Sequence, residues 1–274
     1  MQTTILDFTG VYSFQPFMQE LKGSSRQVSA TANAKIRYID CADIPGTDCY
    51  CDDEAVEIIR RRIADAGIKD AGGIHFFDNG NYHYMSKIWT DMVQEPFSLV
   101  VFDHHPDMQE PRFGNILSCG GWVKKVLEEN KFIGNVVIIG VADHLAEEIR
   151  EELSQVGNAS TLDKVTFIKE SELRESLKSS IESGTTEGRI YLSIDKDALS
   201  PAYAATNWDQ GSLDVATLKE IIADLAQNHK ILGVDICGER ARDFAGDEHH
   251  TVQEADARNG ELNRELAEFL AQHL

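Results

Sequence analysis

The chain has 274 residues, 42% of them hydrophobic, which is enough to bury the core of a single globular domain over residues 1–274. Its 46 acidic residues outnumber the 26 basic ones, and the formal net charge of −20 opposes binding to nucleic acid or to an anionic membrane surface. Because no apolar run reaches the roughly 20 residues that cross a bilayer, and the first residues lack a signal-peptide pattern, we expect a cytoplasmic protein.

Short apolar runs rich in β-branched residues alternate along the chain with longer stretches of helical periodicity. The apolar runs predict eight β-strands, over residues 4–8, 36–40, 73–77, 98–103, 135–141, 164–168, 189–195 and 231–236. The amphipathic stretches predict helices over residues 52–67, 122–130, 145–157, 171–183, 214–228 and 261–274. A strand followed by a helix, repeated, predicts an α/β fold with three αβα layers around an eight-stranded, mostly parallel sheet.

Acidic residues and histidines follow three of the predicted strands. The strand at 98–103 runs into DHHPD at 103–107, the strand at 189–195 ends in SIDKD at 193–197, and the strand at 231–236 runs into CGE at 237–239. In an open parallel sheet the ligand site lies outside the carboxyl ends of the strands. We therefore expect these three motifs to meet at one edge of the sheet.

The first two motifs have the spacing of metal ligands. Alternate residues of an extended segment share a face, so Asp103, His105 and Asp107 are expected to point one way, as are Asp195 and Asp197. Four carboxylates that face one another repel unless they share protons or neutralise cations. A site of carboxylates with a few imidazoles favours a hard divalent ion such as Mn²⁺.

The order of the motifs resembles the ureohydrolase family of arginases, agmatinases and formiminoglutamases. GNYHY at 80–84 comes first, followed by DHHPD, by SIDKDALSP at 193–201 and by GVDICGE at 233–239. The resemblance implies the arginase/deacetylase-like fold and a binuclear site with two Mn²⁺ ions per chain, in which Asp103 and Asp195 bridge the metals. The implied metal ligands are His83, Asp103, His105, Asp107, Asp195 and Asp197.

The resemblance also implies hydrolysis of a linear C–N bond in a small cationic guanidino or amidino substrate. A hydroxide between the metals would attack the planar carbon of the guanidino or amidino group. Asp107 would orient this hydroxide, and Glu239 would bind the cationic nitrogens of the substrate. Where the family carries a shuttle histidine in SGNxHG, residues 113–121 read FGNILSCGG, and Cys119 lies nearest that place. Substitution by His104 or His144 and a step that needs no shuttle are the alternatives. The relatives commonly assemble as trimers or hexamers, which sets the expectation of a homo-oligomer.

Three alternatives stay open at this point. A DHH motif also occurs in manganese phosphoesterases, which need an upstream DxD motif that is missing before residue 103. A single-zinc amide hydrolase similar to the acetylpolyamine and histone deacetylases would share the fold, although His83 and Asp107 favour two metals. The missing shuttle histidine leaves a non-catalytic, metal-binding relative as the third alternative.

Two further features are expected to be structurally ordinary. The five cysteines are an odd number, which favours reduced thiols, and Cys41, Cys49 and Cys51 lack the paired CxxC motifs of a zinc site. Residues 243–260 are expected to form a solvated loop before the last helix, with an active-site lid that carries His249 or His250 as the alternative.

Overall fold

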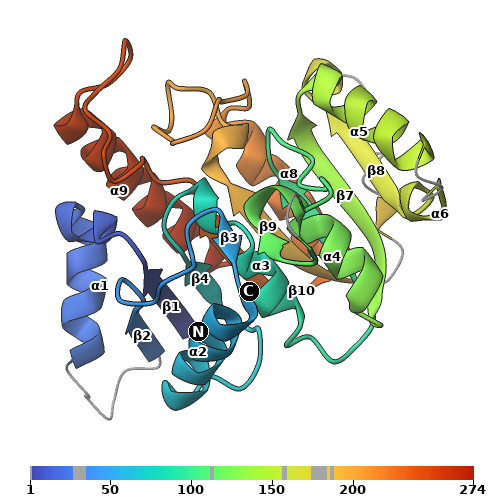
Figure 1. Ribbon diagram of the computed structural model, residues 1–274. Helices are drawn as coiled ribbons and strands as arrows, with labels where there is room; N and C mark the ends of the chain where they lie inside the picture. The colour runs from blue at the N-terminus through green and yellow to red at the C-terminus, as the bar shows by residue number, and fades with distance from the viewer. Residues whose placement is uncertain (1, 27–34, 112–113, 156–158, 174–183, 186–187) are drawn as a thin grey trace.

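A parallel sheet of eight strands forms the centre of the protein, whose computed structural model describes residues 2–26, 35–111, 114–155, 159–173, 184–185 and 188–274 (Figure 1). The strands lie in the order β2-β1-β4-β10-β9-β5-β7-β8, and every pair of neighbours is parallel. They are β1 (Gln2–Asp7), β2 (Lys35–Asp40), β4 (Ile74–Phe76), β5 (Phe97–Phe102), β7 (Ile133–Val141), β8 (Val165–Lys169), β9 (Arg189–Asp195) and β10 (Lys230–Cys237). All eight predicted strands are present, and the predicted fold class is confirmed.

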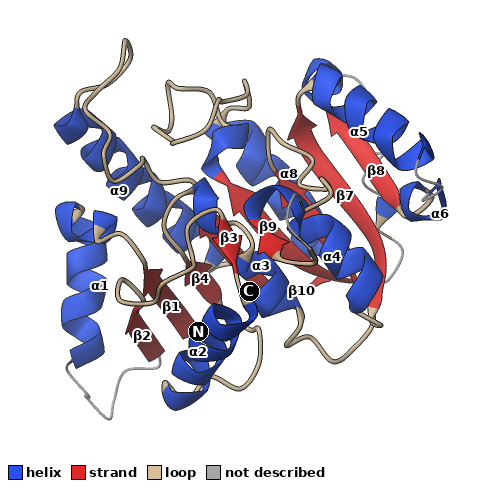
Figure 2. Cartoon of the chain, in the orientation of Figure 1, coloured by secondary structure: helices blue, strands red, loops and turns tan. Residues whose placement is uncertain are grey.

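Helices cover both faces of the sheet (Figure 2). They are α1 (Pro16–Arg26), α2 (Asp53–Asp65), α3 (Met85–Thr90), α4 (Trp122–Glu129), α5 (Asp143–Gln155), α6 (Ala159–Leu162), α8 (Val215–Asn228) and α9 (Val252–Leu270). Apolar side chains of α2, α3, α4 and α5 pack in one core, and those of α1, α8 and α9 pack in another. Strand residues alternate between the cores, with Leu99 and Val101 in the first and Val100 and Phe102 in the second, as a pleated strand requires.

The last helix corrects one sequence-based expectation. Residues 243–260 were expected to be a loop, but α9 already begins at Val252. The hydroxyl of Thr251 accepts a hydrogen bond from the amide of Glu254, whose carboxylate accepts one from the amide of Thr251, and this capping box starts the helix. The expectation was wrong because the first turns of α9 are polar. They are held by buried contacts of Asn259 and Asn263, not by an apolar stripe.

The other predicted helices correspond to α2, α4, α5 and α8, whereas α1, α3 and the short α6 were missed. Most of the helix predicted over 171–183 lies outside the described residues, and the part that is described contains the 3₁₀ turn Glu170–Glu172. In the described part of the chain, no helix is long and apolar enough to cross a membrane.

The sheet has a topological switch between β5 and β9, which lie side by side. The chain leaves β5 for β7 on one side and leaves β9 for β10 on the other, so a crevice opens outside their carboxyl ends. A small antiparallel pair, β3 (Tyr50–Cys51) and β6 (Leu117–Ser118), contributes residues to the wall of this crevice.

Candidate metal centre

The six predicted metal ligands line one cleft of about 390 Å³ at the carboxyl edge of the sheet. Asp103 directly follows β5, Asp195 is the last residue of β9, and Asp197 lies in the 3₁₀ turn Lys196–Ala198. The carboxylate of Asp195 accepts a hydrogen bond of 3.0 Å from the amide of Asp197, which fixes this turn. The strand ends therefore bring together residues that are about 90 positions apart in the chain.

Two backbone features bring the remaining ligands into place. Asp107 has a left-handed φ of 47°, which aspartate tolerates better than most residues and which turns the chain after β5. His83 ends the 3₁₀ turn Gly80–Tyr82. This turn lies so close to β9 that a Cβ on Gly80 would be 3.1 Å from Oδ2 of Asp195.

One ligand group is centred on His83. Its Nδ1 lies 3.1 Å from Oδ2 of Asp103, 3.0 Å from Oδ2 of Asp107 and 3.5 Å from Oδ2 of Asp195. All four side chains are buried. Three carboxylates thus converge on one imidazole nitrogen, in a space from which water is largely excluded.

A second group is centred on His105. Its Nδ1 lies 3.0 Å from Oδ2 of Asp197 and 3.4 Å from Oδ1 of Asp103. The two oxygens of Asp103 therefore face two different histidines, and this carboxylate belongs to both groups.

Burial and like charge control the protonation of the cluster. Burial, together with repulsion from Asp197, raises the pKa of Asp195 to about 7. Burial and repulsion from Asp103 raise the pKa of Asp197 to about 6. Burial disfavours the charged imidazole of His83, but hydrogen bonds to Asp103 and Asp107 outweigh it and raise the pKa of this histidine well above its ordinary value. Without a cation, protons compensate the charge of the carboxylates.

The donor set fits two divalent cations. Oδ2 of Asp103 is buried without a well-aligned hydrogen-bond donor, which is costly for a carboxylate unless a cation contacts it. Hard divalent ions prefer carboxylate and imidazole ligands of the kind gathered here. The two groups, one around His83 and one around His105, provide two positions that share the carboxylate between them.

Further residues orient His83 and Asp107. Nε2 of His83 is 2.9 Å from the hydroxyl of Ser193, which in turn lies 3.0 Å from the hydroxyl of Ser86. Nε1 of Trp122 donates a hydrogen bond of 2.7 Å to Oδ2 of Asp107. Such partners fix the orientation and basicity of metal ligands. None of them was predicted, because nothing in the local sequence around Ser193 or Trp122 marks a contact with so distant a residue.

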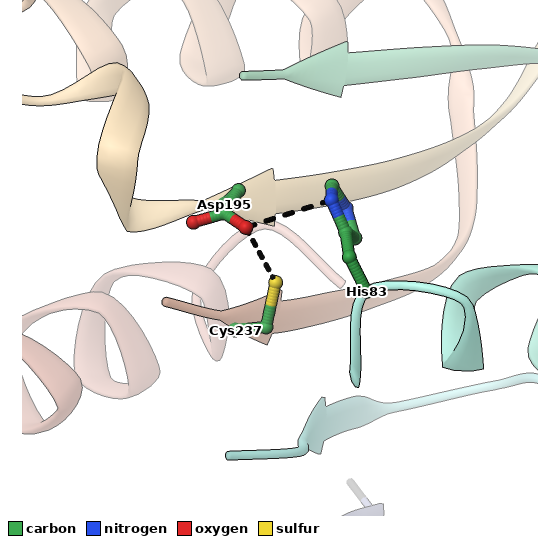
Figure 3. A group of neighbouring side chains, drawn as sticks. All are labelled: His83, Asp195 and Cys237. Atoms are coloured by element: carbon green, nitrogen blue, oxygen red, sulfur yellow. Dashed lines mark hydrogen bonds and ion pairs between the residues drawn. The ribbon is translucent and has the colours of Figure 1, made fainter. Parts of the chain in front are cut away.

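Cys237, the last residue of β10, is a potential ligand that sequence analysis also missed. Its thiol lies 3.1 Å from Oδ2 of Asp195, and Figure 3 shows both side chains pointing toward the space beside His83. Burial, followed by repulsion from Asp195, raises the pKa of Cys237 well above its ordinary value. The residue thus resides in the cluster as a neutral thiol that donates to the carboxylate.

Glu239, which was predicted to bind the substrate's cationic nitrogens, is buried and does not belong to the lining of the cleft. One of its carboxylate oxygens accepts hydrogen bonds from Nζ of Lys196 at 2.5 Å and from Nδ2 of Asn263 at 2.8 Å. The other accepts one from Nε2 of Gln15 at 2.7 Å. Cys119, the predicted substitute for the shuttle histidine, does line the cleft.

Comparison with known proteins identifies the family. The sequence profile of the Arginase family matches residues 18–239. The chain belongs to the arginase family. An uncharacterized protein from Thermotoga maritima is 29% identical over 238 residues, which are 86% of this chain and 78% of that protein.

Solved structures share the fold of this arginase-family chain at low sequence identity. Proclavaminate amidino hydrolase from Streptomyces clavuligerus has a TM-score of 0.65 and 16% identity, over 100% of this chain and 92% of that one. Arginase from Medicago truncatula has a TM-score of 0.62 and 18% identity, over 97% and 86% of the two chains. The resemblance drawn from the four sequence motifs is thereby confirmed, and the low identities mark a divergent member of the family.

Proposed function

We propose that this chain is a hydrolase that uses two Mn²⁺ ions to cleave a linear C–N bond of a guanidino or amidino compound. The observation that carries the proposal is the shared carboxylate of Asp103, whose two oxygens face the histidines of two ligand groups. One ion would be held by His83, Asp103, Asp107 and Asp195, and the other by Asp103, His105, Asp195 and Asp197. Two such cations, when bound, would lower the pKa of water and make a nucleophile available at neutral pH.

The residues of the chain would position the reactants. Asp107, held by the indole N–H of Trp122, would accept a hydrogen bond from the attacking water and orient it toward the planar carbon. Cys119 lines the same cleft and would take part in proton transfer only as a neutral thiol, since a hydrogen bond with Cys49 and burial both raise its pKa.

The cleft suits a cationic substrate. Its described lining contains five carboxylates and no lysine or arginine. Glu110 and the half-exposed indole of Trp208 are among the lining residues. A flat cation would stack on Trp208 and would share the half-exposed carboxylate of Glu110 with Lys124, whose Nζ lies 2.7 Å from it. Glu239 would reach the substrate only after its bond with Lys196 opened, because buried donors occupy both of its oxygens.

The same features disfavour the alternatives. A phosphate ester would be repelled by the acidic lining, which argues against a phosphoesterase. A single-zinc amide hydrolase would need only one ligand group, whereas two groups meet at Asp103.

Metal analysis tests the proposal. The protein would be purified from medium that contains manganese and its metal content measured per chain, beside Asp103→Asn and Asp78→Asn. Asp78 is an equally buried carboxylate that accepts backbone hydrogen bonds and belongs to neither ligand group, so its variant controls for the loss of a buried charge. We expect about two Mn²⁺ in the parent and the control and almost none in Asp103→Asn.

The metal result directs the next assay. Two manganese ions justify a screen of arginine, agmatine, guanidinobutyrate and formiminoglutamate for released urea, formamide or ammonia. One zinc ion per chain would instead favour a deacetylase-like amide hydrolase, and no metal would favour a non-catalytic relative. Analytical ultracentrifugation of the same preparation tests the predicted trimer or hexamer.

A further inference from the structure

Two cysteines face each other at the wall of the cleft, outside the ligand groups. Cys49 directly precedes β3 and Cys119 directly follows β6, and the antiparallel register that pairs Tyr50 with Ser118 puts these cysteines opposite each other one step further on. The amide of Cys119 donates a hydrogen bond of 2.9 Å to the carbonyl oxygen of Cys49. Cys49 has a left-handed φ of 59° and so departs from strand geometry, but this backbone hydrogen bond keeps it next to Cys119. A disulfide requires two cysteines that are adjacent in this way.

The two thiols also differ from the other three in their surroundings. They hydrogen-bond to each other, both are partly exposed, and both line the cleft. Cys41, Cys51 and Cys237 are buried. Reagents in solution can therefore reach this pair and not the rest.

The hydrogen bond gives the two thiols different reactivities. The thiol of Cys119 donates to the sulfur of Cys49 and thereby lowers the pKa of Cys49, against the opposing effects of burial and of Asp48. The same bond, together with burial, raises the pKa of Cys119. This difference favours Cys49 as the attacking sulfur and Cys119 as the resolving one, an order that serine variants test.

We propose that Cys49 and Cys119 form a redox-active dithiol that a low-molecular-weight disulfide, such as oxidised glutathione, converts to an intramolecular disulfide at the wall of the cleft. The sulfur of Cys49 attacks one sulfur of the oxidant and forms a mixed disulfide, and one glutathione leaves as a thiol. Cys119 then loses its proton, attacks the sulfur of Cys49 and releases the second glutathione. Two protein thiols are oxidised to one disulfide, and one small disulfide is reduced to two thiols.

The new bond would act on the segment that carries Asp107. The amide of Gln109 donates to the carbonyl oxygen of Gly120 at 2.8 Å, and the amide of Val123 donates to that of Asp107 at 3.0 Å. A disulfide at Cys119 would therefore tie β3 to the chain beside a predicted metal ligand. The inference itself does not depend on the proposed function, because thiol chemistry can be measured without metal or substrate.

Thiol mapping of the full chain tests the proposal. The reduced protein is equilibrated with mixtures of reduced and oxidised glutathione, alkylated, digested without reduction and mapped by mass spectrometry. We expect a peptide pair joined through Cys49 and Cys119, lighter by two hydrogen atoms, and the loss of two of the five thiols. Cys41, Cys51 and Cys237 should react only after the protein unfolds.

Serine variants separate the two roles. Cys119→Ser should accumulate a glutathione adduct on Cys49, because no resolving thiol is left, whereas in Cys49→Ser residue Cys119 should react roughly tenfold more slowly than Cys49 does in the parent. Cys41→Ser is the matched control and should behave like the parent. The proposal would be overturned if no joined peptide formed in the most oxidising mixture, if Cys49 paired with Cys51 instead, or if Cys119 were the faster thiol.

Discussion

The bond from Trp122 to Asp107 allows a sharp test of how the metal centre is built. Nε1 of Trp122 donates to Oδ2 of Asp107 at 2.7 Å, and the same oxygen lies 3.0 Å from Nδ1 of His83. Trp122→Phe keeps an aromatic ring and removes the donor. A hydrogen bond to a charged group contributes about 1.5–3 kcal/mol, and 1.4 kcal/mol corresponds to a tenfold change in affinity. We expect the variant to bind Mn²⁺ about 10–100-fold more weakly than the parent.

The chain offers a matched control in Trp89. This tryptophan is as deeply buried as Trp122, stacks on His75 with ring centroids 3.7 Å apart, and has no hydrogen-bond partner for Nε1 among the described residues. Trp89→Phe therefore removes a similar apolar area without removing a bond to a predicted ligand. Calorimetric titration of the metal-free proteins with Mn²⁺ gives the affinities, and thermal unfolding shows whether both variants lose similar stability.

The outcome decides between two roles of Trp122. Weak Mn²⁺ binding in Trp122→Phe alone would mean that the indole N–H orients a ligand. If Trp122→Phe and Trp89→Phe bound Mn²⁺ equally well and in the same ratio, the indole N–H would have no part in metal binding. The predicted ligand role of Asp107 would then rest only on its contact with His83.

Three further predictions concern stability. Lys196→Met leaves Glu239 buried without a countercharge, so the free energy of unfolding in urea should fall by about 3–5 kcal/mol. A loss below about 1 kcal/mol would show that the ion pair does not stabilise the fold. The raised pKa values of Asp195 and Asp197, about 7 and about 6, mean that the folded metal-free chain binds protons more tightly than the unfolded chain. The stability that these two groups contribute should therefore be fully present below about pH 4 and be lost as the pH rises through 6 to 7; a free energy of unfolding in urea that rose between pH 6 and 7 would refute this. Gly238→Ala puts a Cβ 2.4 Å from Oδ1 of Asp195 at a φ of 90°, which should cost about 1–3 kcal/mol and lower the melting temperature, whereas an unchanged melting temperature would show that the site can adjust.

The sheet could be predicted because its strands are buried on both faces. Such strands appear in the sequence as nearly continuous apolar runs. The run at residues 135–141, for example, lies within β7. The convergence of DHHPD with SIDKD could also be predicted, because parallel strands place the residues after their carboxyl ends at one edge. The family resemblance added His83, whose surroundings alone do not distinguish a ligand from a capping residue.

The contacts around the centre could not be predicted, because they join distant and locally unremarkable residues. Ser193 lies inside a strand, and only the fold brings its hydroxyl to Nε2 of His83. Cys49 and Cys119 are 70 positions apart and meet through a two-stranded sheet whose strands have two residues each, too short for any periodicity to reveal. α1 was missed for a similar reason, since Met18 is the only buried residue among those of its helix whose burial is described.

The position of Lys196 explains why the carboxylate of Glu239 is not available to bind a substrate cation. Lys196 stands between two predicted ligands in the 3₁₀ turn but does not line the cleft. Its Nζ instead donates to Glu239 and to Asn263 of α9. A buried glutamate there needs a countercharge, and a lysine in this place provides one permanently. A substrate cation would have to compete with an amine that is already desolvated and bonded. Glu110 and Trp208 line the cleft and are half-exposed. Although Glu110 pairs with Lys124 at 2.7 Å, neither residue is enclosed by buried donors as Glu239 is, so both are more accessible to the far end of the substrate.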